Sequence, residues 1–70
     1  MAKGGLSDYR GAIQDFNKVI EINPNSSLAY FYRGITELNL SQKESGCLDL
    51  SKAGEMGYFQ AYDYIKQYCK

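Results

Sequence analysis

The sequence has neither histidine nor tryptophan, and its 70 residues include a single proline and two cysteines. Histidine is the side chain most often used for proton transfer near neutral pH, and two thiols without histidine leave a tetrahedral zinc site half empty. There is no Cys-x-x-Cys redox motif and no glycine-rich phosphate loop. We therefore expect no enzyme, no cofactor and no metal. The carboxylates expected on solvated helix faces, some spaced to pair with a lysine, include Asp15, Glu21, Asp49 and Glu55.

An excess of charge of one sign is also lacking, because eight basic residues balance eight acidic ones and no Lys/Arg cluster forms a stripe. This balance argues against nucleic acid or an anionic membrane as the partner. Apolar runs fall far short of the ~20 residues that span a bilayer, and Met1–Gly5 is not a hydrophobic secretion segment. We expect no membrane insertion. The chain as written points to the cytoplasm, or to the periplasm if an upstream signal has been lost.

The sequence does contain helical periodicity. Between Asp8 and Ile22, apolar residues recur at the spacing that draws one stripe down an amphipathic helix. Ser7 or Asp8 can cap its start, and Pro24 ends it because a proline pushes the preceding residue out of the helical region. The stripe consists of Tyr9, Ala12, Ile13, Phe16, Val19 and Ile20.

Three further helices follow, and no segment alternates as a strand would, so the predicted fold class is all-α with about four helices. Ser41 and Glu44 have the spacing of a capping box that would begin the third helix. Gly57 supplies a left-handed stop at its end. The three helices are predicted over residues 26 or 27 to 39 or 40, 42 to 56, and 58 to 69.

Two glycines lie inside the predicted helices. Glycine in a helix costs about 1 kcal/mol relative to alanine, so Gly34 and Gly46 need a reason. In an antiparallel hairpin the two can face each other and let the backbones cross closely. The alternative is that either glycine only frays a helix end.

Tyrosine is over-represented, and four of the seven tyrosines crowd the last thirteen positions. A tyrosine ring packs in a core while its hydroxyl stays in water, which suits helix seams and also suits interfaces. Packing within the chain is one interpretation, and a partner surface is the other.

Residues 2 to 57, including the first predicted helix with Pro24 at its end, resemble the tetratricopeptide repeat (TPR), a helix-turn-helix unit of 34 residues. Ala12 and Gly46 occupy matching sites and lie 34 positions apart. The residues around Cys47 are also similar to small repeat proteins of Bacteroidetes-type bacteria. The residues that carry the large-small-large and small-large-small signatures of the repeat are Tyr30, Gly34, Leu38, Gly46, Leu50 and Ala53.

The resemblance implies one TPR-like domain over residues 1–70, built from antiparallel helix hairpins of an α-solenoid. Residues 1–25 would be the second half of a truncated repeat, 26–57 a complete repeat, and 58–70 the capping helix that closes such arrays. The first helix of the first repeat is missing, because Ala2–Gly5 would match only its tail. We therefore expect either a C-terminal fragment of a longer array or copies that associate, for instance by domain swapping.

For function, the resemblance implies a scaffold that binds a protein or peptide through a concave groove, without catalysis. The alternative is a structural module that assembles copies of itself, as a dimer or domain-swapped oligomer, and binds nothing else. Phe31 and Ile35 could equally be core residues. The candidate groove is lined by Leu28, Phe31, Ile35, Leu38 and Asn39, and the candidate self-association stripe by Tyr9, Ile13, Phe16 and Ile20.

The two cysteines are placed to meet. Cys47 and Cys69 lie on either side of the turn at Gly57, so an antiparallel pair of helices brings them near each other. A disulfide would add about 3 kcal/mol of stability in the chain-entropy model and would need an oxidising compartment. Two reduced thiols, with Cys47 packed as a small hydrophobe, are the alternative.

Overall fold

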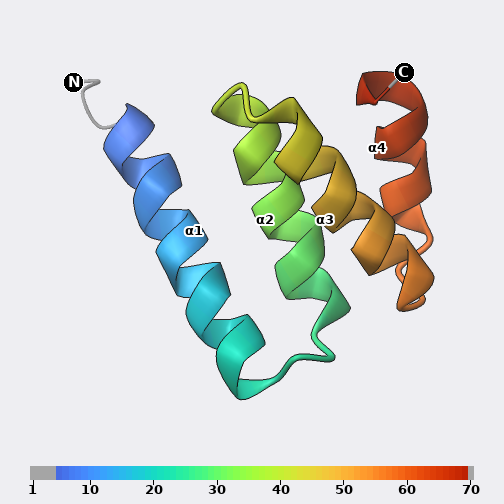
Figure 1. The fold of residues 1–70 in the computed structure, drawn as a ribbon, viewed down its shortest axis with the longest axis horizontal. Coiled ribbons are helices and arrows are strands. Elements are labelled where there is room, and N and C mark those ends of the chain that lie inside the picture. The colour runs from blue at the N-terminus through green and yellow to red at the C-terminus, as the bar shows by residue number, and fades with distance from the viewer. Residues whose placement is uncertain (1–4, 70) are drawn as a thin grey trace.

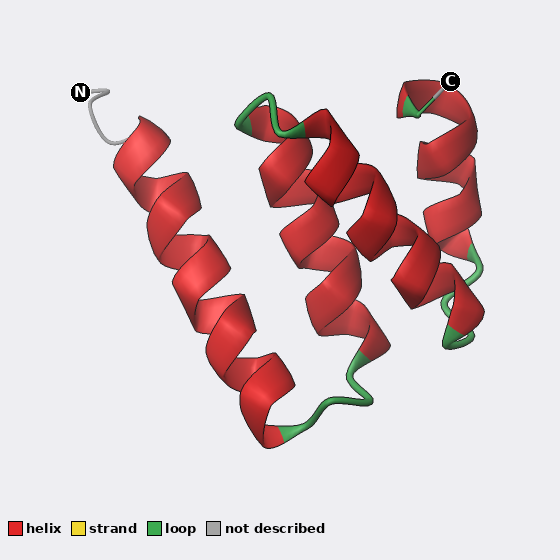
Figure 2. Cartoon of the chain, in the orientation of Figure 1, coloured by secondary structure: helices red, strands yellow, loops and turns green. Residues whose placement is uncertain are grey.

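The computed structural model describes residues 5–69, which form four helices that run side by side, each antiparallel to the one before it (Figure 1). Within this range there is no strand (Figure 2), which confirms the all-α prediction. Consecutive helices make the main contacts, and the molecule measures 36 × 31 × 16 Å. The helices are α1 (Gly5–Ile22), α2 (Ser27–Asn39), α3 (Lys43–Glu55) and α4 (Gln60–Tyr68).

Helix α1 ends at Ile22, as Pro24 predicts, and α2 follows after a short turn. Ser26 caps α2, because its side chain accepts a hydrogen bond from the backbone N–H of Ala29 at 3.3 Å. The start of α1 differs from the prediction, since the helix already begins at Gly5 and a cap at Ser7 or Asp8 is wrong. The part of the predicted first-repeat tail before Gly5 lies outside the described residues.

The capping box predicted at Ser41 is also wrong. The backbone of Ser41 has φ 64°, a left-handed conformation, and Gln42 caps α3 without a side-chain hydrogen bond. The N–H groups of Ser41 and Gln42 donate to the carbonyls of Leu38 (3.1 Å) and Glu37 (2.8 Å). This pair of hydrogen bonds is a Schellman motif, so Ser41 ends α2 and does not begin α3.

The same motif closes α3. Gly57 has φ 111°, its N–H donates to the carbonyl of Gly54, and the N–H of Tyr58 donates to the carbonyl of Ala53, both at 3.0 Å. The predicted left-handed stop at Gly57 is therefore confirmed.

The α2–α3 hairpin is held at a close backbone crossing. A Cβ added to Gly34 would lie 2.9 Å from the carbonyl oxygen of Gly46, and one added to Gly46 would lie 2.7 Å from the carbonyl oxygen of Gly34. Both separations are too short for a side chain, which confirms that the two glycines permit the crossing. The core forms beside it, around Phe31, Leu50, Ala53 and Ala61, with α4 packed against α3 on the far side.

Candidate functional site

The predicted groove on α2 is only partly open. Leu28 is 46% exposed and Asn39 is exposed, whereas Ile35 and Leu38 are half-buried. Phe31 is only 5% exposed. The structure therefore divides the five predicted groove residues between the surface and the core.

Tyrosines cover Phe31. Its ring lies 4.6 Å from the ring of Tyr58, which precedes α4, and 5.2 Å from the ring of Tyr64 on α4, centroid to centroid. Such edge and tilted contacts are favourable aromatic geometries. Phe31 is thus a core residue that also lines a hollow together with Ile35, Tyr58 and Tyr64. Tyr58 and Tyr64 therefore cover most of the Phe31 side chain.

A pocket remains farther along α2. It encloses about 200 Å³ between the C-terminal half of α2 and the face of α4 that carries two tyrosines. Its wall is mostly apolar, with the amide of Asn39 at the rim. A cavity of this size is smaller than a typical small-molecule site and fits one large side chain. The pocket is lined by Ile35, Leu38, Asn39, Tyr64 and Tyr68.

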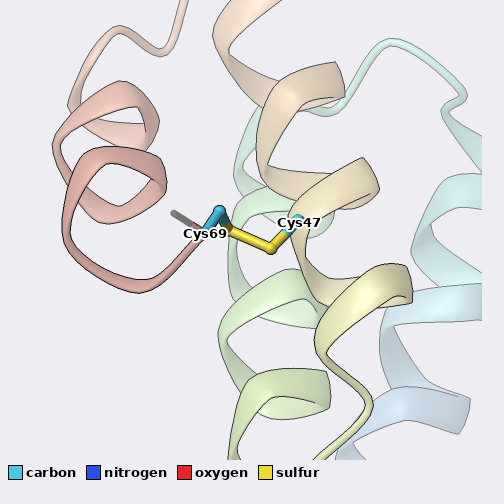
Figure 3. Close-up of a disulfide and its surroundings, with 2 residues drawn as sticks. All are labelled: Cys47 and Cys69. Carbon is cyan, nitrogen blue, oxygen red and sulfur yellow. A yellow bond between two sulfur atoms is a disulfide. The ribbon is translucent and has the colours of Figure 1, made fainter.

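A disulfide lies next to the pocket wall. Cys47 on α3 and Cys69, directly after α4, form a disulfide with their Cα atoms 5.9 Å apart (Figure 3). Cys69 follows Tyr68, so the bond fixes the end of α4 that carries this pocket residue. Both cysteines are half-buried.

An ion pair ties the first three helices together. Arg33 on α2 donates from both Nε and Nη2 to the carboxylate of Asp49 on α3, each at 2.8 Å, and from Nη1 to the side-chain oxygen of Asn17 on α1 at 2.7 Å. Its guanidinium also lies over the ring of Tyr30, at 5.2 Å. Asp49 is only 9% exposed, so the expectation of a solvated face is wrong for this residue.

Glu37 lies next to this ion pair on α2. Its Oε2 is 4.0 Å from Nε of Arg33, and its buried Oε1 has no hydrogen-bond partner among the described residues. Burial raises the pKa of Glu37 from 4.5 to about 8, and the neighbouring carboxylate of Asp49 adds to the rise. Near neutral pH the site therefore holds a neutral Glu37 beside the charged Arg33–Asp49 pair. This group lies inside the hairpin and faces no pocket, so we assign it a structural role.

The predicted stripe on α1 contacts one neighbour. Phe16 stacks on Tyr32 of α2 with ring centroids 6.0 Å apart, and Phe16, Ile13 and Ile20 are half-buried. Tyr9 is 39% exposed, and Val19, one position before Ile20, is 43% exposed. The structure thus brings three of the four stripe residues partly under cover and leaves Tyr9 at the surface.

Residues 5–69 lack candidate metal-binding groups and candidate membrane-spanning helices. This range contains no group of three or more His, Cys, Asp or Glu placed to hold a metal ion. None of its helices has both the length and the apolar character required to cross a bilayer.

Sequence reasoning did not find the pocket residues Tyr64 and Tyr68. In the structure Tyr64 faces Phe31, whereas Tyr62 is 43% exposed and its ring lies against α3 at Gly54. The crowding of tyrosines near the C-terminus was the sequence signal that could have pointed to the pocket residues. It did not say which tyrosines face α2, because a helix with tyrosine at so many positions presents rings on several sides.

The described residues thus define a protein built from stacked helical hairpins with a small apolar pocket. In agreement, residues 16–47 match the family model of the tetratricopeptide repeat. A TPR repeat-containing protein of Borreliella burgdorferi is 46% identical over 37 residues, which are 53% of this chain and 16% of that protein. The chain therefore spans about a sixth of the length of this relative. No solved structure is significantly similar.

These matches show that about half of the chain is similar to TPR proteins, and the four helices have the hairpin arrangement that the resemblance implies. TPR units are in general protein-binding scaffolds without catalysis. The Bacteroidetes-type origin and the status of a fragment stay predictions.

Proposed function

We propose that this chain is a protein-interaction module that binds an apolar peptide in the pocket between α2 and α4. The observation that carries the proposal is the pocket itself, with two aliphatic side chains, two tyrosines and one amide around about 200 Å³. One large apolar side chain of a peptide fills that volume, and Asn39 at the rim can donate to or accept from the peptide backbone.

Three of the five residues predicted from the sequence belong to this pocket. Ile35, Leu38 and Asn39 line it, whereas Phe31 supports it from below by packing on Tyr64. Tyrosine suits the task because its ring gives a large contact area at a small cost in conformational entropy.

A displayed peptide library selected on the whole oxidised chain tests this function. Peptides enriched for a large apolar residue should bind, and Tyr68→Ala should weaken the binding of a selected peptide about tenfold or more, since hot-spot aromatics contribute over 1 kcal/mol. Tyr9→Ala is the matched control, because Tyr9 is a similarly exposed tyrosine on α1, away from the pocket. Equal affinity of both variants for the selected peptide would contradict the assignment.

Self-assembly through α1 is the second candidate. Phe16 and Val19 on α1 match Leu50 and Ala53 on α3 at the family period. On α3 both residues are fully buried, because α2 covers one side and α4 the other. On α1, Phe16 is half-buried and Val19 is 43% exposed. This face is therefore short of one helix compared with its counterpart.

A second copy could supply that helix. If it does, the mass measured by light scattering should rise with concentration, and Val19→Lys should return the chain to a monomer because it places a charge in the apolar interface. A compact monomer at high concentration would contradict self-assembly and leave the peptide-binding module.

A further inference from the structure

Helix α4 is the less firmly held wall of the pocket. It has nine residues, too few for a stable isolated helix, and only Ala61 on it is fully buried. Its contacts with α3, together with the stacking of Tyr64 on Phe31, hold it in place. Its last turn is held by the half-buried Ile65, which packs against the core, and by the covalent link.

The Cys47–Cys69 disulfide closes a loop that contains the whole of α4. The two cysteines are 22 positions apart, and the loop begins with most of α3 and the left-handed turn at Gly57. The start of α4 is fixed by that turn, and its end by the disulfide. Tyr68, which lines the pocket, lies directly beside the second anchor.

We infer that the disulfide is a redox latch that forms the pocket. In the oxidised chain α4 is held on α2 and α3, and Tyr64 and Tyr68 complete the pocket wall. In the reduced chain α4 separates from the α2–α3 hairpin, the pocket loses two of its five residues, and Phe31 is uncovered. The effect on a ligand rests on the proposed function, whereas the release of α4 does not.

The latch is open to attack from the α3 side. Cys47 lines a hollow together with Glu44, Leu48 and Ser51, and Leu48 is 70% exposed. A thiolate from a small or protein thiol attacks Sγ of Cys47, forms a mixed disulfide with it, and expels the Cys69 thiolate, which takes a proton from water. A second thiol then displaces Cys47, so two external thiols are oxidised to one disulfide while the protein gains two thiols.

Amide hydrogen exchange of the whole chain, oxidised and reduced, tests the latch. Reduction should speed exchange in α4 about 100-fold, the factor that corresponds to the lost loop constraint. Exchange in α2 and α3 should change less than about tenfold, since these two helices keep their packing against each other when α4 is released. An α4 that exchanges at the same rate in both states would overturn the inference. So would equal acceleration in all helices, because the bond would then be a staple of the whole fold.

The double variant Cys47→Ser/Cys69→Ser is the matched control. It should show the fast α4 exchange of the reduced chain, and added dithiothreitol should not change it. A response of this variant to dithiothreitol would mean that the reductant acts elsewhere and would overturn the latch.

The ligand arm uses a peptide selected on the oxidised chain. Its affinity should fall at least tenfold on reduction, because Tyr64 and Tyr68 leave the pocket. If α4 is released but the peptide binds equally well, the latch stands and the proposed pocket is wrong. If α4 stays in place and the peptide still depends on Tyr68, the pocket stands and the latch is wrong.

Discussion

The Gly46→Ala substitution tests the close backbone crossing of α2 and α3 most directly. The added Cβ would lie 2.7 Å from the carbonyl oxygen of Gly34 and 3.0 Å from Cγ of Leu38. Leu38 can rotate, but the carbonyl belongs to the α2 backbone, so α2 and α3 must move apart by several tenths of an ångström. Separating close-packed surfaces by that much forfeits a substantial part of their dispersion attraction.

Two effects of this substitution oppose each other. Alanine is favoured over glycine inside a helix by about 1 kcal/mol. Overpacking a tight contact costs about 3 kcal/mol where the obstructing group is backbone and cannot repack. The expected net loss is about 2 kcal/mol, which in a domain of this size lowers the melting temperature by roughly 10 °C.

Gly11→Ala is the matched control, because a Cβ at Gly11 meets nothing within 4 Å. This variant lacks the clash and should gain about 1 kcal/mol from helix propensity alone. Urea titrations followed by circular dichroism give the free energies of unfolding of both variants. Because the domain is small, Gly46→Ala is also measured in the Gly11→Ala background, where the gain offsets part of the loss. Equal stabilisation by the two substitutions would refute the close crossing.

Three more substitutions probe the turn and the ion pair. Wild-type stability should fall by up to about 3.5 kcal/mol as pH rises from 5 to 8, since folded Glu37 keeps its proton up to a pKa of about 8 and the unfolded chain loses it near 4.5. Glu37→Gln should flatten this dependence in melts at the two pH values, and an unchanged slope would exclude Glu37 as its cause. Ser41→Gly should raise the free energy of unfolding measured by urea titration by about 1 kcal/mol, because it relieves the left-handed conformation of a non-glycine residue. A lower free energy of unfolding would contradict the Schellman turn. Arg33→Lys should lower the free energy of unfolding by about 1–2 kcal/mol in the same titration, because a lysine cannot bond Asp49 with two nitrogens and also reach Asn17. The control Lys52→Arg, on the same hairpin, should leave the free energy of unfolding unchanged.

The sequence signals that succeeded are those with a single physical meaning. Pro24 can only end a helix, and a glycine at position 57 after an apolar stripe indicates the left-handed stop that the structure has. The paired glycines at 34 and 46 predicted a contact between helices, because no local reason accounts for them. Such residues report directly on the backbone.

The signals that failed have two meanings. Ser41 followed by Glu44 has the spacing of a capping box, yet the connection between α2 and α3 is so short that Ser41 must serve as the end of α2. A large apolar side chain such as Phe31 is compatible with a position in a groove or in a core. Which one it fills depends on where α4 lies, and Tyr58 and Tyr64 decide that through contacts made across the fold.

The row of helices also determines how the molecule can be handled. Because the main contacts join consecutive helices and the molecule is only 16 Å thick, a change at α1 reaches α4 only through the helices between them. A fluorophore, an affinity tag or a surface linkage attached to the solvent side of α1 is therefore separated from the pocket by α1 and α2. Instruments that require immobilised protein can hold this chain by α1 while α4 remains free to respond.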